Sequence, residues 1–199
     1  MKFSEYELEL QLAYKQHPKN SREEEVYSLI LTLLRDVYSE KIYNEKVFSI
    51  RDIHQSPNPR IDTLYGEAGY PDFAFYSQNL EDDTNPNEKE KILGVVEAKA
   101  IGETYKNDVV HILGEIKSFK KVLYTNGILW KFYDDEKKKV TSLDEGYIWK
   151  INLLGEETEN ESAVFSKKTE KVIPGLSFSK WRMLRKKLRE CTEWDNKFK

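Results

Sequence analysis

The sequence has very little cysteine, no long hydrophobic run and no excess of positive charge. Its 199 residues include one cysteine, Cys191, so no disulfide can form within the chain, which is typical of a reducing cytosol. The first residues have no apolar signal segment and no window approaches a membrane-spanning length, so we expect a cytoplasmic protein without membrane contact. The formal net charge of -3 excludes binding to nucleic acid through an overall basic charge, so any such contact must come from a local patch or from metal ions.

Several functional motifs are also missing. There is no G-x-x-x-x-G-K-[ST] stretch, which excludes a P-loop motor, and neither zinc-finger spacing nor a helix-turn-helix pattern offers a means of sequence readout. Charged residues make up 34% of the chain and aromatic residues 13%, a balance typical of a globular rather than a disordered protein. We therefore predict a single domain over residues 1–199.

Hydrophobic periodicity predicts an α/β protein with helices at both ends and strands around a central helix. The second predicted helix begins with a capping-box pattern, Ser21 followed by Glu24, and polar stretches at 78–90 and 155–171 are expected to be exposed excursions. This order indicates a mixed central sheet with helices packed on its faces. The predicted elements are helices over 3–16 and 21–41, strands over 46–53, 71–76 and 91–99, a helix over 106–121, a hairpin within 122–140 that turns at 125–127, a strand over 146–153 and a helix over 178–194.

Two charges close an otherwise apolar strand in the stretch KILGVVEAKA at 91–100. Side chains on a strand alternate between faces, so Glu97 and Lys99 should project to the same side. Asp72 begins the preceding strand, and Pro71 before it predicts a strand end that is loosely paired or at a sheet edge. If the two strands pair antiparallel, the start of one lies beside the end of the other, and Asp72 meets Glu97.

This pairing would bring two carboxylates into a partly dry site, where they repel each other unless a cation lies between them. Mg²⁺ takes oxygen ligands and is often held by one or two carboxylates with a substrate phosphate, and a bound metal lowers the pKa of its water. Lys99 would orient the attacking water or stabilise developing charge, a combination that suits phosphodiester hydrolysis. Plainer interpretations exist for each residue: Asp72 as a turn residue after proline, and Glu97 with Lys99 as an ion pair on a solvated edge strand.

The segments GYPD at 69–72 and EAK at 97–99, with the core helix and TNGILWKFY at 125–133 in the same order, resemble the PD-(D/E)xK nuclease superfamily. They are similar in particular to the N-terminal nuclease domain of type I restriction endonuclease motor subunits and their small relatives. The match covers about 21–133, and the last strand and basic helix at 146–194 form an extension. The resemblance implies a restriction-endonuclease-like core and cleavage of DNA that depends on Mg²⁺ or Mn²⁺.

In this family the aspartate and glutamate bind the metal and the lysine assists the water, which assigns those roles to Asp72, Glu97 and Lys99. The family usually has another acid on the helix before the first strand. Glu23, Glu24 and Glu25 compete for that place, and with about 100° per residue Glu23 lies nearest the apolar stripe of its helix. Glu23 is therefore expected to supply a further metal ligand or base, although all three acids could simply favour the positive helix N-terminus.

The family often carries a glutamine on the helix after the Glu-x-Lys strand, and here His111 stands at that place. Its imidazole could contact a phosphate or a metal-bound water, whereas a lone histidine on an apolar helix face is more often a core group with its hydrogen bonds satisfied. Tyr70 is a candidate substrate contact, with Tyr65 and Glu67 of the same loop, because that loop adjoins the predicted site.

Positive charge is concentrated on the last predicted helix. Such a run could follow the phosphates of a nucleic acid and would make binding salt-dependent, although it is also typical of the solvated face of an amphipathic helix. A weaker second strip lies on the core helix, at Lys117, Lys120 and Lys121. The candidates on the last helix are Lys180, Arg182, Arg185, Lys186, Lys187 and Arg189.

Two classes of function follow from these patterns. The first is a metal-dependent deoxyribonuclease, in a restriction, defence, phage or mobile-element context, that acts on DNA and depends on a separate protein for specificity or translocation. The second is a nuclease-like fold that binds DNA or a protein without cleaving it, since a fold does not fix a function. RNA as the substrate, the oligomeric state (a dimer included) and endo- against exonuclease action all stay open.

Overall fold

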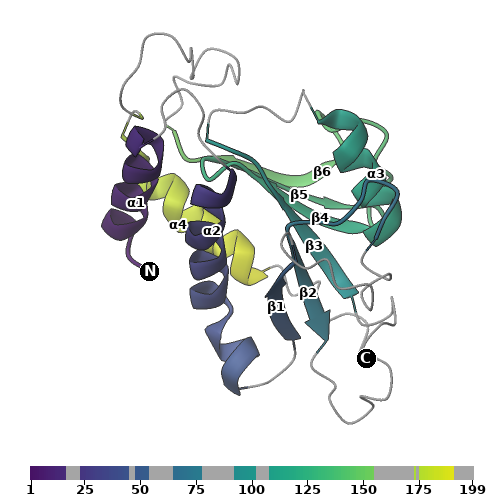
Figure 1. Ribbon diagram of the computed structural model, residues 1–199, viewed down its shortest axis with the longest axis horizontal. Coiled ribbons are helices and arrows are strands. Elements are labelled where there is room, and N and C mark those ends of the chain that lie inside the picture. Colours follow the sequence, from purple (N-terminus) through teal and green to yellow (C-terminus); the bar gives the residue numbers. More distant parts are fainter. Residues whose placement is uncertain are drawn as a thin grey trace.

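The computed structural model describes residues 1–16, 23–44, 48–53, 65–77, 92–101, 108–154, 173 and 175–190 (Figure 1). These residues form a six-stranded sheet with the strands in sequence order and helices on both faces. No described helix is both long and apolar enough to cross a bilayer. The elements are α1 (Phe3–Gln16), α2 (Glu23–Val37), η1 (Glu40–Asn44), β1 (Phe48–Asp52), β2 (Phe73–Ser77), β3 (Ile92–Ala98), α3 (Val109–Phe119), β4 (Lys121–Thr125), β5 (Leu129–Asp134), β6 (Tyr147–Asn152) and α4 (Phe178–Glu190).

The sheet is mixed because one of its five strand pairs is parallel. Strands β3 and β4 run parallel, and α3 lies between them in the chain as the crossover that such a pair requires. The other neighbours, β1–β2, β2–β3, β4–β5 and β5–β6, are antiparallel. Phe73 faces Val96 across the β2–β3 pair, so the start of β2 lies beside the end of β3.

Two hydrophobic cores lie on the two faces of the sheet. Helices α1, α2 and α4 cover one face, where the stripe Val26, Ile30 and Leu33 is buried as its helical spacing predicts (Figure 1). Helix α3 covers the other face with Ile112 and Ile116. Alternate residues of each strand enter the two cores. Helices α2 and α3 therefore approach the end of β3 from opposite faces of the sheet, where their side chains contact Lys99 and Glu97 respectively.

The predicted order of helices and strands and the mixed sheet are confirmed, but two local predictions are wrong. Strand β2 lies between β1 and β3, so the edge position suggested for it is wrong, whereas the alternative of a loosely paired strand end agrees with Pro71 and Asp72 lying before the first paired residue, Phe73. The second helix ends at Val37 rather than at 41, and a π-helical turn follows over Glu40–Asn44. Ser21 of the capping box, Cys191 and the polar stretches at 78–90 and 155–171 lie outside the described residues.

Candidate active site

Three of the predicted residues converge at the end of β3. Asp72 immediately precedes β2, Glu97 is the penultimate residue of β3 and Lys99 follows that strand, and all three are buried. The antiparallel β2–β3 register that the sequence predicted brings them together. Because the strands meet inside the sheet, the alternative of an ion pair on a solvated edge strand is wrong.

Lys99 contacts two acids from two different elements. Its Nζ lies 2.5 Å from Glu97 Oε1 and 3.4 Å from Glu23 Oε1. Glu97 and Lys99 therefore project to the same side, as strand alternation predicted. Burial alone would lower the pKa of Lys99, but the Glu97 carboxylate beside it raises that pKa above its usual value, so the ammonium stays charged.

Asp72 accepts hydrogen bonds at both carboxylate oxygens. Tyr27 donates its hydroxyl to Oδ1 over 2.5 Å, and the backbone N–H of Ala98 donates to Oδ2 over 2.7 Å. Burial and the nearby charge of Glu97 raise the pKa of Asp72 to about 7, although these two hydrogen bonds and Lys99 oppose the shift. The sequence analysis missed Tyr27, whose position one helical turn after Glu23 was the available signal.

Glu23 is the first residue of α2, and it faces the site as the helical phase predicted. One oxygen lies near Lys99, and the other lies 3.3 Å from the hydroxyl of Tyr27. Its side chain keeps 37% of its surface exposed, so it forms the open wall of an otherwise buried cluster. Glu24 is exposed, and Glu25 lies on the α1 side of the helix beside Glu5 and Glu9.

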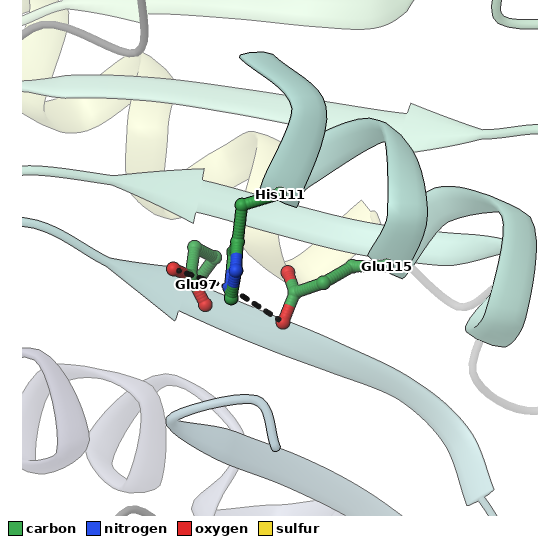
Figure 2. A group of neighbouring side chains, drawn as sticks. All are labelled: Glu97, His111 and Glu115. Carbon is green, nitrogen blue, oxygen red and sulfur yellow. Dashed lines mark ion pairs between the residues drawn. The ribbon is translucent and has the colours of Figure 1, made fainter. Parts of the chain in front are cut away.

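His111 and Glu115 reach the site from α3, on the other face of the sheet (Figure 2). His111 Nε2 lies 3.1 Å from Glu97 Oε1 and 3.7 Å from Glu115 Oε1. One third of the His111 side chain is exposed, so this residue belongs to the site and is not a core histidine. Glu115 was not predicted, although a lone acid on the apolar face of VVHILGEI, one turn after His111, is a visible signal.

The charges of these groups are unevenly balanced. Burial alone would raise the pKa of Glu97, but the His111 hydrogen bond and the Lys99 ammonium hold it below its usual value, so Glu97 is ionised. The hydrogen bond to Glu97 raises the pKa of His111. Burial and the charge of Glu97 raise the pKa of Glu115 well above its usual value, which keeps this carboxyl protonated.

The acids of this site are of the type that binds a divalent cation, and among the described residues the group whose ligand atoms all lie within 4.8 Å of one another is Glu97, His111 and Glu115. Four carboxyl groups, from Glu23, Asp72, Glu97 and Glu115, lie around the Lys99 ammonium and the His111 imidazole, and burial together with the charge of Glu97 raises the pKa values of Asp72 and Glu115. The predicted ligands Asp72, Glu97 and Glu23 carry the oxygen atoms that Mg²⁺ and Mn²⁺ prefer, but their ligand atoms do not form such a close group, so a shared cation would require their side chains to move together. A cation would relieve the repulsion from Glu97, which adds to the effect of burial on these pKa values.

Tyr70 lies at the rim of this site, two residues before Asp72. Its ring makes an edge contact with Tyr65 at 5.0 Å between centroids, and both rings are exposed. Glu67 of the same loop forms an ion pair with Lys117 and so points toward the side chains of α3. The loop that leads into Asp72 therefore presents two exposed aromatic rings to the solvent.

The basic residues of α4 are divided between the fold and the solvent. Its apolar face, Trp181, Leu184 and Leu188, is buried, and Arg185 lies 2.7 Å from Asp36 Oδ2. That ion pair makes Arg185 unavailable to a phosphate unless it opens. The candidates that keep exposed or partly exposed surface are Lys180, Arg182, Lys186, Lys187 and Arg189.

The second basic strip is occupied by acids of the same chain. Each of its lysines forms an ion pair within the fold, which reduces its value as a phosphate track. The pairs are Lys117 with Glu67 at 2.7 Å, Lys120 with Asp135 at 3.6 Å and Lys121 with Glu136 at 3.2 Å.

In comparisons with known proteins, no family model, no curated protein and no solved structure matches the chain.

Proposed function

We propose that the protein is a metal-dependent nuclease that hydrolyses DNA phosphodiester bonds, with its α/β sheet serving as a restriction-endonuclease-like core. One observation carries the proposal: Asp72, Glu97 and Lys99, predicted from the motif alone, share one buried cluster with Glu23. Buried charges are costly, and a chain that only needed stability would be served as well by apolar residues. The presence of these charged residues together in one buried place therefore favours a catalytic role.

Each residue then has a defined task. Asp72, Glu97 and Glu23 hold Mg²⁺ or Mn²⁺, and the metal supplies Lewis-acid stabilisation of the phosphate and a more acidic bound water. Lys99 carries a fixed positive charge at a place where negative charge develops on the substrate. Tyr27 and the Ala98 N–H hold both oxygens of Asp72 and so set the orientation of that ligand.

The wider surface suggests how the substrate is held. The net charge of -3 gives no general attraction to DNA, so binding relies on the metal, on the exposed cations of α4 and on the aromatic rim at Tyr65 and Tyr70. Because the sequence has neither zinc-finger spacing nor a helix-turn-helix pattern, the proposal includes a separate protein that supplies specificity or translocation.

The proposal is tested by cleavage of plasmid and linear DNA with Mg²⁺ or Mn²⁺. We expect Asp72→Ala and Glu97→Gln to lower the cleavage rate by at least about a hundredfold, since each removes a metal ligand. Asp144→Ala, in the exposed turn before β6, is the control and should cleave like the wild type. Cleavage that survives Asp72→Ala would reject this site. Single-stranded RNA in a parallel reaction decides between the two sugars.

The alternative, a binding protein that does not cleave, has one specific observation in its favour. Lys99 Nζ and His111 Nε2 both contact the same oxygen of Glu97, so this carboxylate is already neutralised without a metal. A site closed in this way would bind ligand but not react. Salt-sensitive DNA binding together with no cleavage at any Mg²⁺ or Mn²⁺ concentration would establish this alternative.

A further inference from the structure

The α3 side of the cluster contains a group of donors that the proposed nuclease does not use. Glu97, His111 and Glu115 each offer one ligand atom, and these atoms all lie within 4.8 Å of one another (Figure 2). His111 and Glu115 are one helical turn apart on α3, the spacing at which two side chains on one helix face can share a metal ion.

Glu115 is the observation that requires an explanation. It is fully buried, and among the described residues neither of its carboxylate oxygens has a hydrogen-bond partner. Its ion-pair contact among the described residues is with His111, at 3.7 Å, which is too long for a hydrogen bond, and the neighbouring Glu97 carboxylate repels its charged form. A buried carboxyl without partners costs stability, and Gln or Leu at this place on the helix would avoid the cost.

We propose that Glu97, His111 and Glu115 form a binding site for a first-row transition-metal ion, separate from the Asp72 site and sharing Glu97 with it. A cation would supply the missing partner of Glu115. Ligand atoms bound to one ion at about 2.1 Å lie up to about 4.2 Å apart, so the observed spread closes with a small movement of the side chains.

The ligand types decide which metal the site takes. Mg²⁺ prefers oxygen and loses its water reluctantly, whereas an imidazole nitrogen with two carboxylates suits Mn²⁺, Fe²⁺ or Zn²⁺. The site therefore selects these ions over Mg²⁺. Lys99, which contacts Glu97, can move toward Glu23, its second acidic partner, when the ion enters.

The test measures Mn²⁺ binding directly, by calorimetry and by electron paramagnetic resonance, so its result does not depend on nuclease activity. We expect Glu115→Gln and His111→Gln each to weaken binding at least about tenfold, because each removes a ligand. Asp72→Asn should leave one Mn²⁺ bound within about threefold of the wild-type affinity, and Glu136→Gln, on an exposed turn, is the control. A tenfold excess of Mg²⁺ should displace little of this Mn²⁺.

Several outcomes would overturn the proposal. They are a wild type that binds no Mn²⁺, Glu115→Gln and His111→Gln variants that bind it unchanged, and an Asp72→Asn variant that loses all bound Mn²⁺. Because one third of the His111 side chain is exposed, its variant should fold even if the Glu115 variant does not, and circular dichroism checks both. Intact Mn²⁺ binding with no DNA cleavage would reject the nuclease proposal alone.

Discussion

At the scale of single residues, the protonation of Asp72 should make the stability of the metal-free protein depend on pH. Its pKa rises from an ordinary 3.8 to about 7 on folding, so the folded state binds the proton more tightly than the unfolded state. The contribution of Asp72 to the free energy of unfolding is then fully present below pH 4. It is lost as the pH rises to about 7, and the loss is up to about 4 kcal/mol.

Asp72→Asn should remove this dependence. Asparagine can keep both hydrogen bonds, accepting from the Ala98 N–H through Oδ1 and donating to the Tyr27 hydroxyl through Nδ2. We therefore expect the variant, in EDTA, to be more stable than the wild type at pH 8 by about 1–3 kcal/mol and close to it at pH 4. Urea unfolding at both pH values measures the difference. An equal difference at both pH values would show that Asp72 does not titrate in this range.

Tyr27→Phe is the second prediction at this scale. The hydroxyl of Tyr27 lowers the pKa of Asp72 by its hydrogen bond, so its loss should raise that pKa further. The acidic limb of the pH–rate profile of metal-dependent cleavage should move to higher pH, with the plateau rate reduced less than tenfold because no metal ligand is removed. Tyr76→Phe, a buried tyrosine of β2 that contacts Arg51, is the control; a limb shifted equally in both variants would contradict the assignment.

The sequence predicted these residues unequally, for physical reasons. Strand alternation and one antiparallel register were enough to place Asp72, Glu97 and Lys99, because a strand leaves a side chain only two directions. Tyr27 and Glu115 were missed because their roles depend on how closely α2 and α3 approach the end of β3. That approach is set by packing between elements distant in the sequence.

At the scale of elements, the β4–β5 turn should tolerate an added methyl group poorly, because it packs against two helices. Gly127 has a φ of 83°, and a Cβ there would lie 2.8 Å from Leu10 Cδ1 and 3.2 Å from Val26 Cγ1. Tyr6 also donates its hydroxyl to the carbonyl of Gly127, which fixes the turn against α1. The turn thus lies where α1 and α2 meet the sheet, and neither helix can easily move aside.

Gly127→Ala should destabilise the fold both through this crowding and through the strain of a non-glycine residue at positive φ. Gly69→Ala has the strain without the crowding, so it measures the strain alone. Gly69 also has a positive φ, 107°, but its Cβ would meet nothing within 4 Å. We expect Gly69→Ala to cost about 1–2 kcal/mol, and Gly127→Ala to cost about 1–3 kcal/mol more. Thermal unfolding compares the two variants. Equal losses would show that the core around Leu10 can absorb the methyl group.

The elements were predictable in type and order but not in all their pairings. The Asn-Gly signal correctly located the turn between β4 and β5, because its cause is local. The edge position suggested by Pro71 was wrong, because whether β2 has a neighbour on each side depends on β1, more than twenty residues away along the chain. The end of α2 and the π-helical turn after it gave no sequence signal that we recognised.

At the scale of the whole molecule, the site joins elements that are distant along the chain. Glu23 begins α2, Glu97 closes β3, and His111 and Glu115 come from α3. The helices lie on opposite faces of the sheet, so the two proposed metal sites, which share Glu97, would together link both cores (Figure 1). Metal bound to such a site stabilises the folded state as a unit, because the unfolded chain does not assemble the ligands.

We therefore expect Mn²⁺ to raise the melting temperature of the EDTA-treated protein. A concentration one hundred times the dissociation constant adds about 2.7 kcal/mol, which for a chain of this length corresponds to roughly 5–10 °C. Glu97→Gln should abolish most of this rise, because Glu97 belongs to both proposed metal sites, whereas Glu136→Gln should keep it. Asp72→Asn and Glu115→Gln should each keep part of it, because each removes a ligand from one site only. If Mn²⁺ raised the melting temperature of Glu97→Gln as much as that of the wild type, the metal would bind elsewhere, and both proposed metal sites would be rejected.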